Sequence, residues 1–148
     1  MLQRTKIRDW LLGMTGMLFL ISAAVMLTLS GSLLYRSDMK RLHLSEKTGY
    51  SEEEILANYK ELIDYNCSPF HTSLNFPTFP MSEEARIHFQ EVKTIFQGFL
   101  WVLLLTGTGY LTGAIFLVRR KEWRFLKYTA ICSLVLPALT GILTAANW

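Results

Sequence analysis

The histidines are the residues that could carry acid–base chemistry near neutral pH, and all three lie between residues 43 and 88 of this 148-residue sequence. Glu91 follows His88 three positions later and Val92 follows it four positions later, so one face of a helix would carry these residues. A carboxylate one turn from an imidazole can orient the ring and raise its basicity. His88 and Glu91 are therefore the candidate catalytic pair, although a histidine near a glutamate is also common without a catalytic role.

The other two histidines have simpler interpretations. His43 stands among Lys40, Arg41 and Glu46, just after a long hydrophobic run, which is typical of a solvated histidine at a membrane surface. His71 lies in a proline-rich stretch, where we expect a local hydrogen-bonding role.

The two cysteines are not expected to form a site. Cys67 lies between the first two hydrophobic runs and Cys132 lies inside the third, so we do not expect them to pair. The sequence has no Cys-x-x-Cys motif and no cluster of histidine and cysteine, so we predict no metal site. Cys132 is interpreted as a small packing residue.

The elements that would position these residues are three long runs without charge, 11–34, 98–118 and 128–146. A helix needs about 20 apolar residues to cross the hydrocarbon of a bilayer. Any non-helical backbone would leave polar groups unpaired in lipid, so each run should be a helix. The predicted fold class is an all-α integral membrane protein, with three transmembrane helices and a small, mostly helical extracellular domain between the first and second.

The first run could also be a cleaved signal peptide. It follows Arg4, Lys6 and Arg8 and contains the small residues Ser22-Ala23-Ala24. The apolar core of a signal peptide spans about 7–15 residues, however, and this run is longer. A retained membrane anchor is the favoured interpretation.

The charges at the ends of the runs predict the orientation in a cell membrane. The N-terminus before Trp10 has three basic residues and one acid, and the segment 119–127 has five basic residues and one acid. The long segment 36–93 has seven basic and ten acidic residues. Since positive charge marks the cytoplasmic side, we predict these segments: cytoplasmic 1–10, transmembrane 11–34, extracellular 35–95, transmembrane 98–118, cytoplasmic 119–127 and transmembrane 128–146.

The basic residues also bear on partners. They stand at membrane boundaries, where lysine and arginine are expected beside lipid headgroups. We therefore expect membrane lipids, and no nucleic acid, as partners.

The extracellular segment has its own helix signals. Ser51 and Glu54 match a capping box, and apolar residues at helical spacing follow, which predicts an amphipathic helix of about 13 residues that ends near 65–66. Three prolines then forbid a continuous helix between 67 and 80. A new helix should begin near Glu83 and continue into the second transmembrane run, to about Val118. The pattern leaves open whether short strands form near 76–79.

Two features together resemble the bacterial lipoprotein intramolecular transacylase family. One is Phe76-Pro77-x-Phe79 in the proline-rich stretch, and the other is the helix that reads His88-Phe89-Gln90-Glu91-Val92-Lys93 before a membrane run. The resemblance extends over essentially the whole chain, and its specificity comes from the order and spacing of short motifs.

The resemblance implies an acyl transfer at the outer face of the membrane. The substrate would be a diacylated lipoprotein, and one acyl chain would move from the diacylglyceryl group to the α-amino group of the N-terminal cysteine, which gives a lyso-form lipoprotein. The reaction would need no cofactor. By resemblance, His88 matches the first of two essential family histidines, and Glu91 would be its orienting partner.

The sequence departs from the family at its C-terminal end. Family members have a second histidine in a Phe-His motif after the third crossing, followed by a fourth crossing, whereas this sequence ends at Trp148. We therefore expect a truncated member with little activity. The alternative hypothesis is a non-enzymatic membrane module whose extracellular domain binds a partner or senses the envelope, with the aromatic stretch 70–79 as its contact surface.

Overall fold

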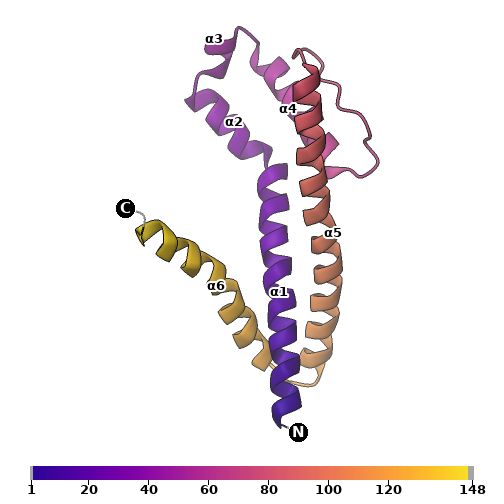
Figure 1. Ribbon diagram of the computed structural model, residues 1–148, viewed down its shortest axis with the longest axis vertical. Helices are drawn as coiled ribbons and strands as arrows, with labels where there is room; N and C mark the ends of the chain where they lie inside the picture. The colour runs from indigo at the N-terminus through magenta and orange to yellow at the C-terminus, as the bar shows by residue number, and fades with distance from the viewer. Residues whose placement is uncertain (1, 147–148) are drawn as a thin grey trace. The chain divides into compact units, whose positions relative to one another are not determined.

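The computed structural model describes residues 2–146, apart from the side chains of the first four residues and of Leu136. Met1, the first residue of the predicted segment 1–10, lies outside the described residues. The described chain consists of helices and connecting segments without any strand (Figure 1). The all-α prediction is therefore confirmed. The helices are α1 (Leu2–Ser30), α2 (Ser32–Arg41), α3 (Leu44–Thr48), α4 (Glu52–Cys67), α5 (Glu83–Arg119) and α6 (Arg124–Ala146).

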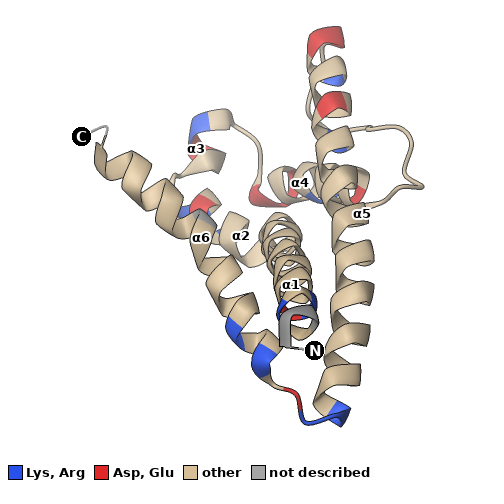
Figure 2. Ribbon diagram, turned by 60° about the horizontal axis from the view of Figure 1, so that its bottom comes forward, with Lys and Arg blue, Asp and Glu red and all other residues tan. Residues whose placement is uncertain are grey.

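Three helices of the described chain are long and apolar enough to cross a membrane, namely Thr5–Ser30, Glu83–Arg119 and Arg124–Ala146. Figure 2 shows that the middle of α5 and the greater part of α6 carry no charged residue. Large apolar side chains lie exposed along these helices, for example Leu105, which is 72% exposed. In water such surfaces would be a liability, whereas hydrocarbon solvates them.

The chain divides into two compact units, and α1 and α5 contribute to both. The three-helix unit comprises Met1–Ala24 and Trp101–Trp148, and the central unit comprises Val25–Leu100. The candidate catalytic pair belongs to the central unit.

Small residues bring the helices of the three-helix unit together. A Cβ atom added at Gly13 of α1 would lie 2.8 Å from the main-chain carbonyl carbon of Tyr128, and one added at Gly16 would lie 2.5 Å from the ring of Tyr110. The Tyr110 hydroxyl donates a hydrogen bond of 3.2 Å to Thr129 of α6. Glycine and hydroxyl contacts of this kind are typical of helices packed in lipid, where the hydrophobic effect cannot hold helices together.

A cluster of four charged side chains closes one end of this unit. Arg8 donates hydrogen bonds to Asp9 at 2.7 Å and to Glu122 at 2.6 Å, and Arg124 lies 3.9 Å from the second Asp9 oxygen. Asp9 is fully buried. The cluster ties the start of α1 to the α5–α6 connection with its positive and negative charges in balance.

In the central unit, α1 ends at Ser30, and the ψ of 84° at the following Gly31 departs from helical geometry. A Cβ atom there would lie 3.2 Å from the carbonyl oxygen of Leu27, so glycine permits the break before α2. The uncharged run 11–34 continues past this break, and neither α2 nor α3 was predicted.

The predicted capping box is present at the start of α4. The main-chain N–H of Glu54 donates a hydrogen bond to the Ser51 hydroxyl, and the Glu54 carboxylate accepts one from the main-chain N–H of Ser51. The helix that follows has 16 residues and ends at Cys67, slightly later than expected. The proline-rich stretch forms no helix, and α5 begins at Glu83 as predicted.

Candidate functional site

His88 and Glu91 lie on one face of α5, near its start, and both side chains are exposed. The His88 ring centre is 5.8 Å from that of the adjacent Phe89. Among the described residues, no hydrogen bond or ion pair joins His88 to Glu91. The shared face is therefore present, whereas the contact that would orient the imidazole is not formed in this structure.

The opposite face of α5 is occupied by the chain that connects α4 to α5. Successive residues on a helix point about 100° apart, so Gln90, two positions on, and Lys93, five positions on, point about 160° and 140° away from His88. These two residues line a pocket of 350 Å³ together with Tyr65, Pro69 and Thr72. One helix thus carries an exposed histidine on one side and a packed polar surface on the other.

Lys93 is the centre of that packed surface. Its ammonium group donates a hydrogen bond of 3.2 Å to the main-chain oxygen of Ser68 and a second bond to the main-chain oxygen of His71. The same group lies 4.1 Å from the centre of the Tyr65 ring, within the range of a cation–π interaction. One turn further along α5, Gln97 donates a hydrogen bond of 2.7 Å to the main-chain oxygen of Asn66. Together these contacts fix the end of α4 against α5.

Asn58 fixes the other half of the connecting segment. Its buried side-chain amide donates to the hydroxyl of Thr78 at 2.6 Å and to the main-chain oxygen of Glu54 at 2.7 Å. Its carbonyl oxygen accepts hydrogen bonds from the main-chain N–H groups of Thr78 and Phe79, at 3.3 and 3.1 Å. Prolines prevent a regular main-chain hydrogen-bond pattern in this segment. The Asn58 side chain therefore supplies hydrogen-bond partners that a helix or strand would otherwise provide from the main chain.

His71 lies in the same segment between α4 and α5, where its side chain helps to hold the segment against α4. Its Nε2 atom is 3.1 Å from Glu61 Oε1, and the same oxygen accepts a hydrogen bond of 3.0 Å from the main-chain N–H of Asn75. His71 therefore makes the local hydrogen bond that its position predicts. His43 forms an exposed ion-pair contact with Glu46 at 3.5 Å.

Aromatic contacts connect the loop to the turn of α5 that carries His88. The rings of Phe76 and Phe89 meet edge to face with centres 5.6 Å apart, and Phe76 also packs against Phe79 at 6.0 Å. Such pairs favour one relative orientation of the rings. Because Phe89 adjoins His88, this packing sets the rotation of the helix and keeps His88 outward.

The two cysteines are free and belong to different units. Cys67 Sγ lies 3.7 Å from the Ser30 hydroxyl, and Cys132 is buried in α6. Among the described residues, no three histidine, cysteine, aspartate or glutamate side chains lie together in a way that could hold a metal ion.

Comparison with known proteins decides the family. Residues 10–148 match the family described as lipoprotein intramolecular transacylase Lit. The chain belongs to this family. A solved structure of the membrane-integral Lit from Bacillus cereus is 27% identical, with a TM-score of 0.88, and the match covers 99% of this chain and 68% of that one. The resemblance seen in the sequence is thereby confirmed.

Two further Lit structures from Bacillus cereus match as well, one with a histidine-to-arginine and one with a histidine-to-alanine mutation. Each is 26% identical with a TM-score of 0.86, and the matches cover 65% and 66% of those chains. This chain thus spans about two thirds of the length of its solved Lit relatives. A comparison with curated proteins found no match. The membrane-integral relatives and the three apolar helices make this chain a multi-pass membrane protein.

Proposed function

We propose that this chain acts in lyso-form lipoprotein synthesis, as a membrane acyltransferase in which His88 transfers the proton. The acyl chain would move from the diacylglyceryl group of a lipoprotein to the α-amino group of its N-terminal cysteine. Membership of the Lit family is the observation that carries the proposal. Because the chain spans about two thirds of the length of its solved relatives, the activity of those whole proteins is a proposal for this chain.

The reaction requires the movement of one proton. The amine nitrogen attacks the ester carbonyl carbon, a C–N bond forms, and the C–O bond to glycerol breaks. Over the whole reaction, one proton leaves nitrogen and one reaches the glyceryl oxygen, so atoms and charges balance without a cofactor. A histidine side chain can take the proton and return it near neutral pH.

His88 is the residue we propose for this transfer. It is exposed, so a substrate can reach its ring. It precedes Thr94, the first residue of the uncharged stretch of α5, by six positions, or about 9 Å along the helix axis. The headgroup region adds only about 5–7 Å on each side of the hydrocarbon, so His88 would lie at the membrane surface. We further propose that His88 corresponds to the histidine replaced in the two mutated Lit structures.

Glu91 is proposed as the partner that orients the His88 ring. The two residues share a face one turn apart, which is within reach of a rotamer change. Catalytic hydrogen bonds often tighten only when the substrate binds. The exposed positions of both side chains are compatible with such a rearrangement.

We also propose that 1–10 and 119–127 lie in the cytoplasm and that 35–95 lies outside the cell. Five of the six charged residues of the α5–α6 connection, counted over 119–127, are basic, as expected on the cytoplasmic side. His88 would then face the outer leaflet, where lipoproteins are anchored.

Expression in a bacterial host without its own transacylase tests the proposed function. A reporter lipoprotein is purified, and its N-terminal lipopeptide is sequenced by tandem mass spectrometry. The transfer leaves the intact mass unchanged, so the fragments must show one acyl chain on nitrogen and one on glycerol. An empty vector is the control. A reporter that stays diacylated on glycerol in both strains, in an assay sensitive enough to detect the low activity expected of this chain, would contradict the proposal and favour the non-enzymatic membrane module.

A further inference from the structure

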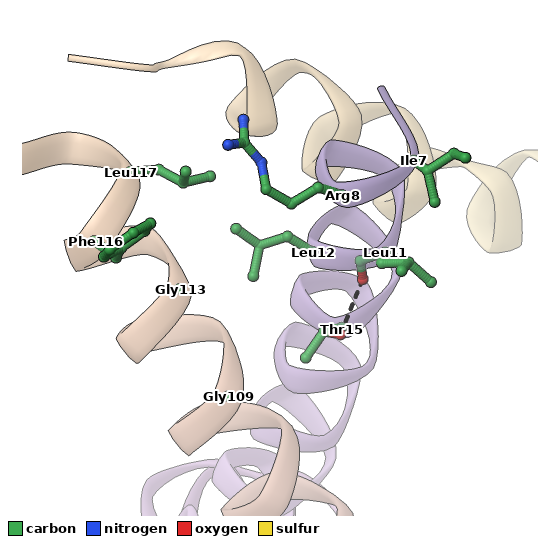
Figure 3. Close-up of a pocket in the computed structure, with 9 residues that line it drawn as sticks. All are labelled: Ile7, Arg8, Leu11, Leu12, Thr15, Gly109, Gly113, Phe116 and Leu117. Atoms are coloured by element: carbon green, nitrogen blue, oxygen red, sulfur yellow. Dashed lines mark hydrogen bonds between the residues drawn. The ribbon is translucent and has the colours of Figure 1, made fainter. Parts of the chain in front are cut away.

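A groove runs between α1 and α5 in the three-helix unit, on the side of the α5–α6 connection. Its volume is 470 Å³, within the usual range for the binding site of a small ligand. Figure 3 shows its two walls. They include Ile7, Leu11 and Thr15 from α1, and Gly109, Gly113 and Phe116 from α5.

The lining of the groove suits a hydrocarbon chain. The Thr15 hydroxyl is already bonded to the main-chain oxygen of Leu11 at 2.9 Å, as the dashed line in Figure 3 marks. Thr15 therefore has no need of a polar partner in the groove. Gly113 lets the helices approach, since a Cβ atom there would lie 2.8 Å from Leu12. A Cβ atom at Gly109 would first meet a neighbour at 3.8 Å, so this glycine leaves the groove open.

Positive charge stands at one end of the groove. The guanidinium carbon of Arg120 lies 4.2 Å from the centre of the Phe116 ring, and Phe116 lines the groove. Arg8 also lines it, but Asp9 and Glu122 neutralise its charge. Within the described residues, no acidic side chain forms an ion pair with Arg120. An anionic group would therefore be attracted to the Arg120 end.

We propose that this groove binds an anionic phospholipid from the adjacent leaflet, with one acyl chain between α1 and α5 and the phosphate on Arg120. Both walls belong to candidate membrane-spanning helices, so lipid is the medium that meets the groove. Basic sites between membrane helices are a known way to hold anionic headgroups. The combination of an apolar groove and an unneutralised cation fits an amphiphile better than a second, uniformly apolar helix. The inference does not depend on the proposed acyl transfer.

Native mass spectrometry of the protein purified in mild detergent tests this inference. The protein is titrated with phosphatidylglycerol, with phosphatidylcholine and with inorganic phosphate. We expect one phosphatidylglycerol to bind more tightly than phosphatidylcholine, and free phosphate neither to bind nor to compete. Equal binding of the two lipids, or binding of free phosphate alone, would overturn the assignment of an anionic phospholipid.

Two variants with matched controls locate the site. Gly109→Leu should abolish the preference for phosphatidylglycerol over phosphatidylcholine, because the leucine side chain fills the groove. Gly98→Leu should keep this preference, because Gly98 lies outside the groove and a Cβ atom there meets nothing within 4 Å. Arg120→Gln should weaken binding about fivefold, and Arg36→Gln, at another exposed arginine, should not. Melting temperatures establish that the variants fold. Unchanged lipid binding in Arg120→Gln, or a lipid-free dimer of the wild-type protein, would overturn the proposal.

Discussion

The ammonium group of Lys93 lies 4.1 Å from the centre of the Tyr65 ring, on the face of α5 opposite to His88. The same group donates hydrogen bonds to the main-chain oxygens of Ser68 and His71. The residues of the His88–Lys93 motif therefore lie on two different faces of one helix. One face holds the proline-rich segment, and the other presents the imidazole.

Replacement of Lys93 by methionine should loosen the segment that follows α4. The variant keeps an unbranched side chain but loses two hydrogen bonds from a charged donor, which are worth about 1.5–3 kcal/mol each. Hydrogen exchange at residues 68–75 should accelerate about tenfold or more in mass-spectrometric measurements. Lys60→Met, at an exposed lysine of α4, is the matched control. Equal exchange rates in the two variants would show that Lys93 does not hold the segment after α4 in place.

Asn58→Ala should lower the stability of the central unit. The substitution leaves the main-chain N–H groups of Thr78 and Phe79 without the buried acceptor that they share, at a cost of about 2–3 kcal/mol for the lost hydrogen bonds. The melting temperature should fall by roughly 5–10 °C.

The matched control for Asn58 is Asn75→Ala. The exposed Asn75 side chain bonds only the nearby Ser73 hydroxyl, and exposed substitutions usually change stability by less than about 0.5 kcal/mol. If both asparagine variants have the melting temperature of the wild type, the Asn58 side chain does not stabilise the segment between α4 and α5.

The start of α4 should loosen in acid. The hydrogen bond from the main-chain N–H of Ser51, assisted by its hydroxyl, lowers the pKa of Glu54 below its ordinary value. Glu54 therefore contributes stability that is present above its unfolded-state pKa of about 4.3. That stability is lost as the pH falls through the folded-state pKa.

Hydrogen exchange in the first turn of α4 measures this effect between about pH 3 and 6, after correction for the intrinsic rate. Glu54→Gln should remove the pH dependence assigned to this turn. Glu53→Gln is the neighbouring control, since Glu53 takes no part in the capping box. Identical pH profiles for the wild type and Glu54→Gln would refute this role of the carboxylate.

Asp9→Ala should destabilise the three-helix unit. Asp9 is fully buried and lies against Arg8 and Arg124, so its removal leaves positive charge without its buried partner. Both arginines are part-exposed and Arg8 keeps its bond to Glu122, so we expect a cost of about 1.5–3 kcal/mol, that of a hydrogen bond to a charged group, and a fall of roughly 5–10 °C in melting temperature. Asp64→Ala, at an exposed aspartate, should melt within a degree or two of the wild type. A similar melting temperature for Asp9→Ala would show that the cluster does not support the fold.

The sequence predicted the helices that follow strong local rules. The uncharged runs are long enough to require helices, and the Ser51–Glu54 pair defines the start of α4. The break at Gly31 and the helices α2 and α3 were not predicted. They depend on how the chain turns after α1. Their residues show no clear apolar period, and the capping glycine Gly49 marks where α3 ends but not where α2 or α3 begins.

The candidate site was predicted in part. The spacing of His88 and Glu91 predicted a shared face of a helix, and both residues lie there. The roles of Lys93 and Asn58 were missed, because their partners are main-chain groups far away in the sequence. Lys93 belongs to the His88–Lys93 motif, so the sequence could have marked it as a residue of interest. The fold was needed to show that its side chain points toward the segment after α4.

The central claim is that His88 transfers the proton in the acyl migration. The most direct measurement is the initial rate at which the purified protein forms N-acyl product from a synthetic diacylated lipopeptide, followed by tandem mass spectrometry. His43→Asn is the matched control, because asparagine tolerates the positive φ of 51° at that position. We predict that His88→Ala lowers the rate at least about 100-fold, while His43→Asn retains the wild-type rate. A His88→Ala protein as fast as the wild type would contradict the account.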